Sequence, residues 1–440
     1  MPVRSVLLGI AASGLALAAT IPAQPTFYKN VLPLLQTHCQ QCHRPGEAAP
    51  MSFMTYQSAR PWAKAIREAV ITRKMPPWPA DPHFGKFTND RSLSRADIDT
   101  LVAWADAGAP EGDFADAPKP AQFVDGWGIH KPDAVFEMPN EFTVPASGTI
   151  DYQYVVIPSG FTEDKWVQEL EARPGNRKLV HHIIAFIRPP GSKWLKDAQP
   201  GIPYVPPKEQ NEDREKRKHK RDEENSAPPE LLVGFAPGTP PAILRPGQAK
   251  LVKAGSDFVF QMHYTANGKP GTDRSRIGLV FAKEAPNERI FTVSATNDKF
   301  EIPAGDGNYE VESEITFQEP ARLVDMMPHM HLRGKDFTYT AYYPTGESEV
   351  LLRVPHYDFS WQLFYYLTEQ KVLPAGTRLH CVAHFDNSPN NPANPDPKSV
   401  VRWGDQSWEE MMMGFFDVAM AADKDPMDLF REKKPARSGD

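Results

Sequence analysis

The alternation of apolar and polar residues divides the chain into a helical part and a longer β-rich part. In "LSRADIDTLVAWADAGAPEG" the apolar residues recur at helical spacing, Ser94 can cap the start with Asp97 three residues on, and Gly108 marks the end. From about residue 125 onward, short runs such as "YQYVVI", "DFVFQMHYTA" and "TRLHCVAHF" are separated by glycine and proline. Short β-rich runs separated by turn residues are typical of β-sandwiches. The pattern predicts helices over residues 24–113 and β domains after them.

Composition narrows the class of protein. A chain of 440 residues is long enough for two or three domains. The 45 prolines are about twice the average frequency of roughly 5% and favour short strands joined by turns. The net charge of −7 argues against a general nucleic-acid binder. Residues 207–230 form a mixed-sign charge run, which predicts a solvated insertion loop.

The N-terminus has the features of a secretory signal peptide. Arg4 precedes an apolar run from Val6 to Ala19, which is shorter than the roughly 20 residues that span a bilayer. Small residues follow it. The sequence therefore predicts a cleaved signal peptide over residues 1–23, with an uncleaved anchor as the alternative. We expect no membrane span after cleavage and a periplasmic or secreted protein.

The stretch "HCQQCH", residues 38–43, contains a C-x-x-C-H motif. Two thiols at this spacing can form thioethers with one haem, and the histidine that follows can ligate its iron. The alternative is half of a zinc site, which needs a second Cys/His pair at close spacing. The motif predicts haem c held by Cys39, Cys42 and His43. The third cysteine, Cys381, is expected to be a buried free thiol.

A second axial ligand for that iron is predicted in "TRKMPPWPA". The two prolines after Met75 favour a stiff, extended loop, as in the Met-Pro loop of small cytochromes c, which this stretch resembles. Met75 is therefore the predicted ligand, and its alternative role is packing. Axial His/Met ligation suits electron transfer. Weaker candidates for the ligand are Met51, Met54 and His83.

Four later stretches carry histidine and methionine: "KLVHHIIAFI", "DFVFQMHYTANG", "MPHMHLRGKDF" and "DQSWEEMMMGFFDV". On a strand, His329 and His331 point to the same side and can bind one ion. His181 and His182 are adjacent, so both can face one ion only if the strand bulges or twists there. Imidazoles with a thioether suit copper, and zinc sites rarely use methionine.

In this order the four stretches resemble the type II copper, ascorbate-dependent monooxygenases, the family of peptidylglycine α-hydroxylating monooxygenase and dopamine β-monooxygenase. The resemblance covers roughly residues 125–425 and implies two jelly-roll β-sandwich subdomains with one copper each. It implies that the electron-storing copper is held by His181, His182 and His263. The copper that binds O₂ and hydroxylates the substrate would be held by His329, His331 and Met411, with Met412 and Met413 as neighbours that could be confused with the ligand.

The chain departs from that family at the substrate site. The peptidylglycine enzymes carry an arginine where this chain has Met327, and an asparagine and a tyrosine where it has Met413 and Phe415. The vertebrate enzymes of the family also rely on several disulfides, and this chain has no pair of cysteines outside the C-x-x-C-H motif. The departures favour a small or apolar substrate over a peptide.

The predicted fold class is multi-domain, with an N-terminal all-α cytochrome c domain followed by two mainly antiparallel β-sandwich (jelly-roll) subdomains. The predicted boundaries are a signal peptide at 1–23, the cytochrome domain at 24–113, a linker at 114–124, copper β-sandwiches at 125–285 and 286–425, and a tail at 426–440.

The predicted function is an exported copper monooxygenase whose haem passes electrons to the two coppers. Its partners would be O₂, an unknown small organic substrate, and an external electron donor, either an ascorbate-like reductant or a redox protein. One alternative is a non-enzymatic haem/copper electron-transfer or copper-handling protein. Another is a haem protein whose β part is only a binding module and whose histidines are inert.

Overall fold

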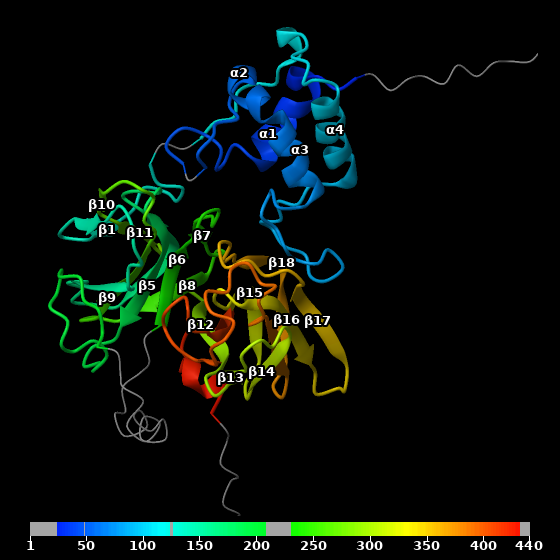
Figure 1. Cartoon of the computed structure of the whole chain (residues 1–440). Helices are drawn as coiled ribbons and strands as arrows, with labels where there is room; N and C mark the ends of the chain where they lie inside the picture. The colour runs from blue at the N-terminus through cyan, green and yellow to red at the C-terminus, as the bar shows by residue number, and fades with distance from the viewer. Residues whose placement is uncertain (1–23, 48, 124–125, 208–229, 432–440) are drawn as a thin grey trace, which may run out of the picture.

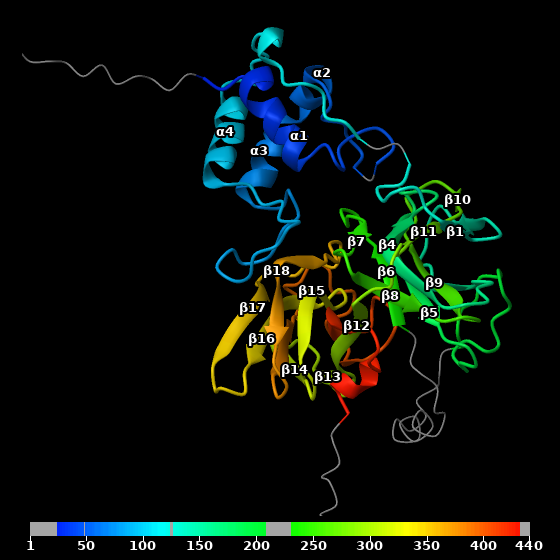
Figure 2. The same cartoon turned by 180° about the vertical axis from the view of Figure 1, so that it is seen from behind.

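The computed structural model describes residues 24–47, 49–123, 126–207 and 230–431 (Figure 1). The predicted signal peptide, nearly all of the charge run and most of the predicted tail lie outside the described residues. In the described part, a small helical portion stands above two β-rich halves (Figures 1 and 2).

The helical portion contains four short helices around a small apolar core. The predicted start of the last helix is confirmed. The Ser94 side chain accepts a hydrogen bond from the Asp97 amide, and the Asp97 carboxylate accepts one from the Ser94 amide. Gly108 follows that helix with a φ of 83°. The core contains Phe27, Leu35 and Trp104, all fully buried. The helices are α1 (Leu32–His38), α2 (Tyr56–Ala59), α3 (Ala63–Ile71) and α4 (Arg95–Asp106), with single turns η1 (Phe27–Val31), η2 (Arg60–Trp62) and η3 (Phe114–Asp116) beside them.

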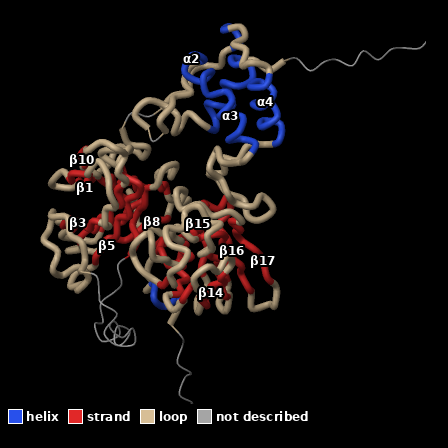
Figure 3. Tube along the Cα trace, in the orientation of Figure 1, coloured by secondary structure: helices blue, strands red, loops and turns tan. Residues whose placement is uncertain are grey.

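The predicted fold class is wrong in its N-terminal part. Most of the described chain is β-sheet, and the helices α1 to α4 have only four to twelve residues each (Figure 3). Loops and turns make up much of residues 24–117. The described residues therefore contain no large all-α cytochrome c domain. The physical reason is the density of proline and glycine between the helices, which ends each of them after one to three turns.

The first β half packs two layers around one core. The core between them contains Val155, Ile183 and Phe260 of one layer and Leu170 and Leu279 of the other. One layer is a four-stranded sheet in the order β3 (Gln153–Pro158), β9 (Asp257–Tyr264), β5 (Val180–Arg188) and β6 (Glu230–Phe235). The other layer consists of β1 (Ala134–Glu137), β11 (Arg276–Phe281), β4 (Lys165–Arg173) and β8 (Gln248–Val252), with β7 (Ala242–Ile243) beside β4; β2 (Phe142–Val144) and β10 (Gly271–Asp273) pair separately.

The second β half has the same two-layer construction. Its core includes Met326, Tyr339, Cys381 and Phe416, and Cys381 is the buried free thiol that was predicted. One layer runs in the order β12 (Glu288–Asn297), β21 (Met412–Ala421), β15 (Ala321–His329) and β18 (Tyr365–Leu373). The other is β14 (Tyr309–Thr316), β19 (Arg378–Phe385), β16 (Gly334–Tyr342) and β17 (Ser348–Val354); β13 (Glu301–Ile302) and β20 (Val401–Arg402) pair apart, and η4 (Pro426–Leu429) follows β21.

One nine-stranded sheet joins the two halves. β8 of the first half pairs in parallel with β12 of the second, with Gln248 opposite Glu288. All other strand pairs in that sheet are antiparallel. The continuity holds one half against the other, so residues on their facing surfaces can build a shared site.

The loop between α3 and α4 fastens the helical portion to β18, the last strand of the nine-stranded sheet. We call residues 76–92 the arm. Asn89 donates to the Phe364 carbonyl at 2.7 Å and accepts from the Tyr366 amide at 3.1 Å. Phe87 forms an isolated bridge with Leu367. The arm therefore covers a sheet edge whose backbone groups would otherwise be unpaired.

Candidate metal centre

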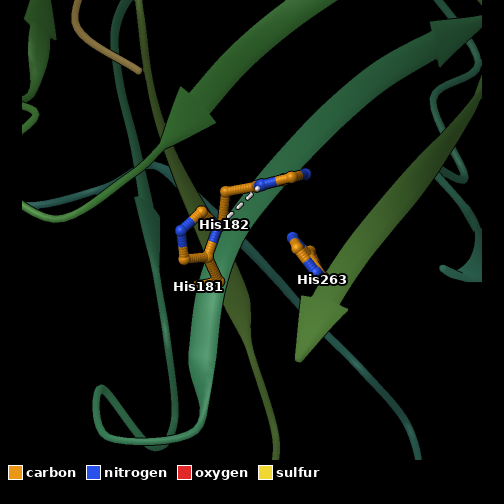
Figure 4. Close-up of side chains that lie close together, drawn as sticks. All are labelled: His181, His182 and His263. Atoms are coloured by element: carbon orange, nitrogen blue, oxygen red, sulfur yellow. Dashed lines mark hydrogen bonds between the residues drawn. The ribbon is translucent and has the colours of Figure 1, made fainter. Parts of the chain in front are cut away.

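Three histidines converge on adjacent strands of the first half (Figure 4). One ring nitrogen of each of His181, His182 and His263 can be chosen so that all three lie within 4.8 Å of one another. The Nδ1 atoms of His181 and His182 are 3.3 Å apart. The Nδ1 atom of His263 is buried without a hydrogen-bond partner among the described residues. Three converging nitrogens of this kind fit one metal ion.

A break in the strand register brings His181 and His182 to one side. The pairing of β5 with β9 shifts between Val180 and His182, which places the irregularity at His181. His182 then lies opposite His263 across the two strands, and the ring centroids are 4.9 Å apart. Both adjacent histidines can therefore face one ion, as the sequence analysis required.

A second pair of histidines lies at the end of β15. The ring centroids of His329 and His331 are 5.2 Å apart. Nδ1 of His329 is 2.9 Å from Oε1 of Gln362, and Nδ1 of His331 is 3.2 Å from the Glu409 carbonyl. Each ring is thus held through Nδ1, and Nε2 of His331 is buried without a partner among the described residues. Metal-binding histidines are commonly oriented in this way.

Burial keeps all five imidazoles neutral. It lowers the pKa of His181 and of His329 to about 4 and that of His263 to about 3. The pKa values of His182 and His331 lie well below the ordinary range, again chiefly because of burial. Neutral imidazole is the form that binds metal ions.

Phe359 lies between the two sets of histidines. Its ring centroid is 5.4 Å from that of His181, 6.1 Å from that of His263 and 5.8 Å from that of His331. His182 also lines one narrow space with Met327 and Gln362 of the second half. The five histidines therefore gather where the two halves face each other, on surfaces turned away from both cores.

The choice of a methionine ligand narrows to two residues. Met412 is fully buried in the core of the second half, so it points away from the histidines. Met413 lies opposite His329 in the pairing of β21 with β15, and cross-strand partners share a face. Met411, two residues before Met413, lies on the same side by alternation and precedes β21 directly. The assignment of Met411 stays a prediction, and Met413 is a second candidate.

Glu410 and Arg333 organise the loop around His331, although the sequence pattern predicts no role for them. Glu410 is fully buried and accepts from the His331 amide at 2.8 Å and the Arg333 amide at 2.6 Å. Burial raises its pKa to about 8, although those hydrogen bonds lower it. Arg333 donates to the Trp408 carbonyl and to Asn387. The sequence does contain a signal for both residues, because Glu410 belongs to an acidic pair directly before the methionines and Arg333 follows His331 by two residues.

The C-x-x-C-H motif lies in a turn directly after α1. The amides of Cys42 and His43 donate to the Cys39 carbonyl at 3.1 and 2.9 Å. The ring of His43 stacks on Phe53 at 4.3 Å, and its Nδ1 is buried without a partner in the described part of the chain. Burial lowers the pKa of His43, so the imidazole is neutral. These donors fit a covalently attached haem.

Both thiols of the motif are free, and burial raises their pKa values, that of Cys39 to about 12. A reactive dithiol needs lowered pKa values, so the motif is not of that kind. Within the described residues, no third Cys, His or carboxylate joins the pair in a metal-binding cluster. The zinc alternative therefore gains no support.

Met75 follows α3 and precedes the arm. Its amide donates to the Ala69 carbonyl at 3.2 Å, and the Met75–Pro76 peptide bond is cis. Its side chain is half-buried. The role of its thioether as a haem ligand stays a prediction.

None of the described helices is long and apolar enough to span a membrane. No family model and no curated protein matches the chain.

Some solved structures of viral capsid proteins are weakly similar to the chain. One is the infectious bursal disease virus Gx strain, with 9% identity, a TM-score of 0.18, and coverage of 69% of this chain and 77% of that one. Another is the VP2 subviral particle of that virus, with 9% identity, a TM-score of 0.19, and coverage of 68% and 74%. The Macrobrachium rosenbergii nodavirus has 10% identity, a TM-score of 0.17, and coverage of 70% and 95%. Scores this low imply neither a shared fold nor a shared function.

Proposed function

We propose that this chain is an exported copper monooxygenase that carries one covalently attached haem and two copper ions. The observation that carries the proposal is the convergence of His181, His182 and His263, whose ring nitrogens lie within 4.8 Å and are held neutral by burial. The resemblance of the four histidine and methionine stretches to the type II copper monooxygenases gives the reaction class. The first copper would be held by these three residues.

The second copper would be held by His329 and His331 with a methionine. Gln362 and the Glu409 carbonyl fix the Nδ1 side of the two rings, which leaves Nε2 for a ligand. A thioether in the set favours Cu(I), the state that reacts with O₂. When bound, the coppers would supply one electron each to the reaction R–H + O₂ + 2e⁻ + 2H⁺ → R–OH + H₂O.

The haem would be held by Cys39, Cys42 and His43. It would receive electrons from an external reductant and pass them to the coppers. The arm supports this proposal, because it joins the region after Met75 directly to the segment around Phe364. That segment also contains Gln362, the hydrogen-bond partner of His329. The haem-bearing portion and the second histidine pair are thus linked through a short stretch of chain.

We expect the His263→Ala variant to lose one copper. The unmodified protein should bind about two coppers per chain and the variant about one, because the first site would keep only two imidazoles. Elemental analysis of the protein after copper loading and desalting measures this. The matched control is His384→Ala, since His384 is a half-buried histidine that pairs with Asp336 instead. Equal copper in both variants would contradict the ligand assignment.

We expect the Cys39→Ser/Cys42→Ser double variant to contain no covalently bound haem. Thioether attachment needs both sulfur atoms, and serine cannot replace them. Haem that stays with the polypeptide after acid–acetone extraction, detected by its pyridine haemochrome spectrum, measures the result. Cys381→Ser is the control, because that thiol is buried in the second β half. Covalent haem in the double variant would rule out this attachment site.

A further inference from the structure

A cavity of about 360 Å³ lies where the arm and the two β halves meet. Thr88 and Asn89 of the arm line one side, and residues of β15, β18 and β21 line another. Its wall also includes Ile243, which is 58% exposed, so the cavity borders solvent on the side of β7. The volume lies in the range of sites for small ligands. The cavity is separate from the candidate metal centre, and none of the five histidines lines it.

Two buried carboxyl groups share one buried ammonium group in its wall. Asp325 and Asp417 are 3% and 6% exposed, and Lys250 is 3% exposed. Nζ of Lys250 is 3.1 Å from Asp417 and donates to Thr292 at 2.8 Å. The Asp325 side chain accepts from the Asp417 amide at 3.3 Å, and among the described residues it has no other hydrogen bond or ion pair. Asp325 is therefore left with a long hydrogen bond and no cation of its own.

Neighbouring cations do not compensate Asp325. Arg289 pairs with Glu230 at 2.8 Å, and Arg245 is exposed and donates to the Thr368 carbonyl. Burial raises the pKa of Asp325 well above its ordinary range, Asp417 raises it further, and Lys250 lowers it. The wall thus has two carboxyl groups for one ammonium group, and a cation beside Asp325 would stabilise the ionised form of that carboxyl.

Two aromatic rings complete the wall beside these carboxyl groups. Phe364 and Tyr366 stack with their centroids 6.0 Å apart and their planes within 10°. Asp325 lies opposite Tyr366 in the pairing of β15 with β18. Pro240 and Pro241 add apolar surface. Aromatic rings next to carboxyl groups are the surroundings that bind alkylated ammonium ions, through cation–π attraction and charge.

We propose that this cavity binds a small quaternary ammonium ion, with its charge beside Asp325 and its alkyl groups against Phe364 and Tyr366. A primary ammonium ion would need three hydrogen-bond acceptors. Among the other acceptor side chains of the wall, Asp417 is engaged with Lys250 and Thr292, and Gln248 with Gln370. A quaternary ion needs none. This site does not depend on the proposed function.

Titration calorimetry of the copper-free full chain with choline tests the proposal. The matched probe is 3,3-dimethylbutan-1-ol, which has the same shape as choline without the charge. We expect choline to bind at least about tenfold more tightly than the alcohol, because the carboxyl groups and the rings recognise the charge. Equal binding of the two probes, or no binding of choline, would overturn the proposal.

Two variants locate the site, and one controls for the change in charge. Asp325→Asn and Tyr366→Leu should each weaken choline binding at least about tenfold, since one removes the carboxyl group that would be ionised beside the cation and the other removes a π face. Asp99→Asn removes a carboxylate that is exposed on α4 and should leave the affinity unchanged. The thermal unfolding of each variant is first compared with that of the unmodified protein, to confirm that the variant is folded. Unchanged affinity in both folded variants would place choline elsewhere and refute the site.

Discussion

In the His331→Ala variant the reduced haem is expected to be reoxidised by O₂ at least about a hundredfold more slowly than in the copper-loaded unmodified protein. In the proposed enzyme, electrons would leave the haem through the coppers, and His331 would be one of three ligands of the copper where O₂ would react. Alanine removes an imidazole whose Nε2 is buried and free for a ligand. The reaction is followed in a stopped-flow instrument by the visible absorption of the haem.

Two controls separate this route from direct reaction of O₂ with the haem iron. Copper-free unmodified protein should be as slow as the His331→Ala variant, because neither contains the second copper. His380→Ala should behave like the unmodified protein, since His380 lies on β19, 3.5 Å from Glu312, away from the centre. Equal rates in the His331→Ala variant and the unmodified protein would show that electrons do not pass through that site.

Copper is expected to stay bound on acidification from pH 7 to pH 5. Protons compete with copper only when the imidazoles of the metal-free, folded protein become protonated. Histidines with the ordinary pKa of about 6.5 would bind protons throughout that range. Here burial lowers the pKa of His181 and His329 to about 4 and that of His263 to about 3. Protons should therefore begin to compete with copper for these imidazole nitrogens only near pH 4.

The sign of this effect is set by the direction of the shifts. A lowered pKa means that the folded, metal-free site takes up protons less readily than the unfolded chain, so acid weakens copper binding late. Copper affinity is measured by competition with a chelator of known proton affinities at half-unit steps of pH, with circular dichroism as the check that the fold persists. A loss of about tenfold or more per pH unit below pH 6.5, with the fold intact, would contradict the burial of these imidazoles.

Local features of the fold followed from the sequence, and long-range ones did not. The start of α4 depends on Ser94 and Asp97, three residues apart, so the sequence contains the whole interaction. The sequence predicts only a stiff loop after Met75 and not the docking of the arm, because the hydrogen bonds of the arm reach Phe364 and Tyr366, about 275 residues later. The error about an all-α domain has a different, local origin. The sequence showed helical spacing but not how short each helix would be between its prolines.

In the candidate site, too, only the features that depend on neighbouring residues could be predicted from the sequence. His329 and His331 could be placed together because they alternate on one strand. The nearness of the two sets of histidines could not be foreseen, because it depends on Phe359, which comes from the segment between β17 and β18, and on the parallel pairing of β8 with β12. Gln362 was missed for the same reason, since a glutamine in a loop gives no periodic signal.

The most direct test of the two-copper account is the copper content of the full chain. The protein is stripped with a chelator, reloaded with excess copper, desalted and analysed for copper per chain, beside a His181→Ala/His182→Ala/His263→Ala variant and a His329→Ala/His331→Ala variant. We predict about two coppers in the unmodified protein and about one in each variant. No copper in the unmodified protein, or the same content in all three proteins, would contradict it.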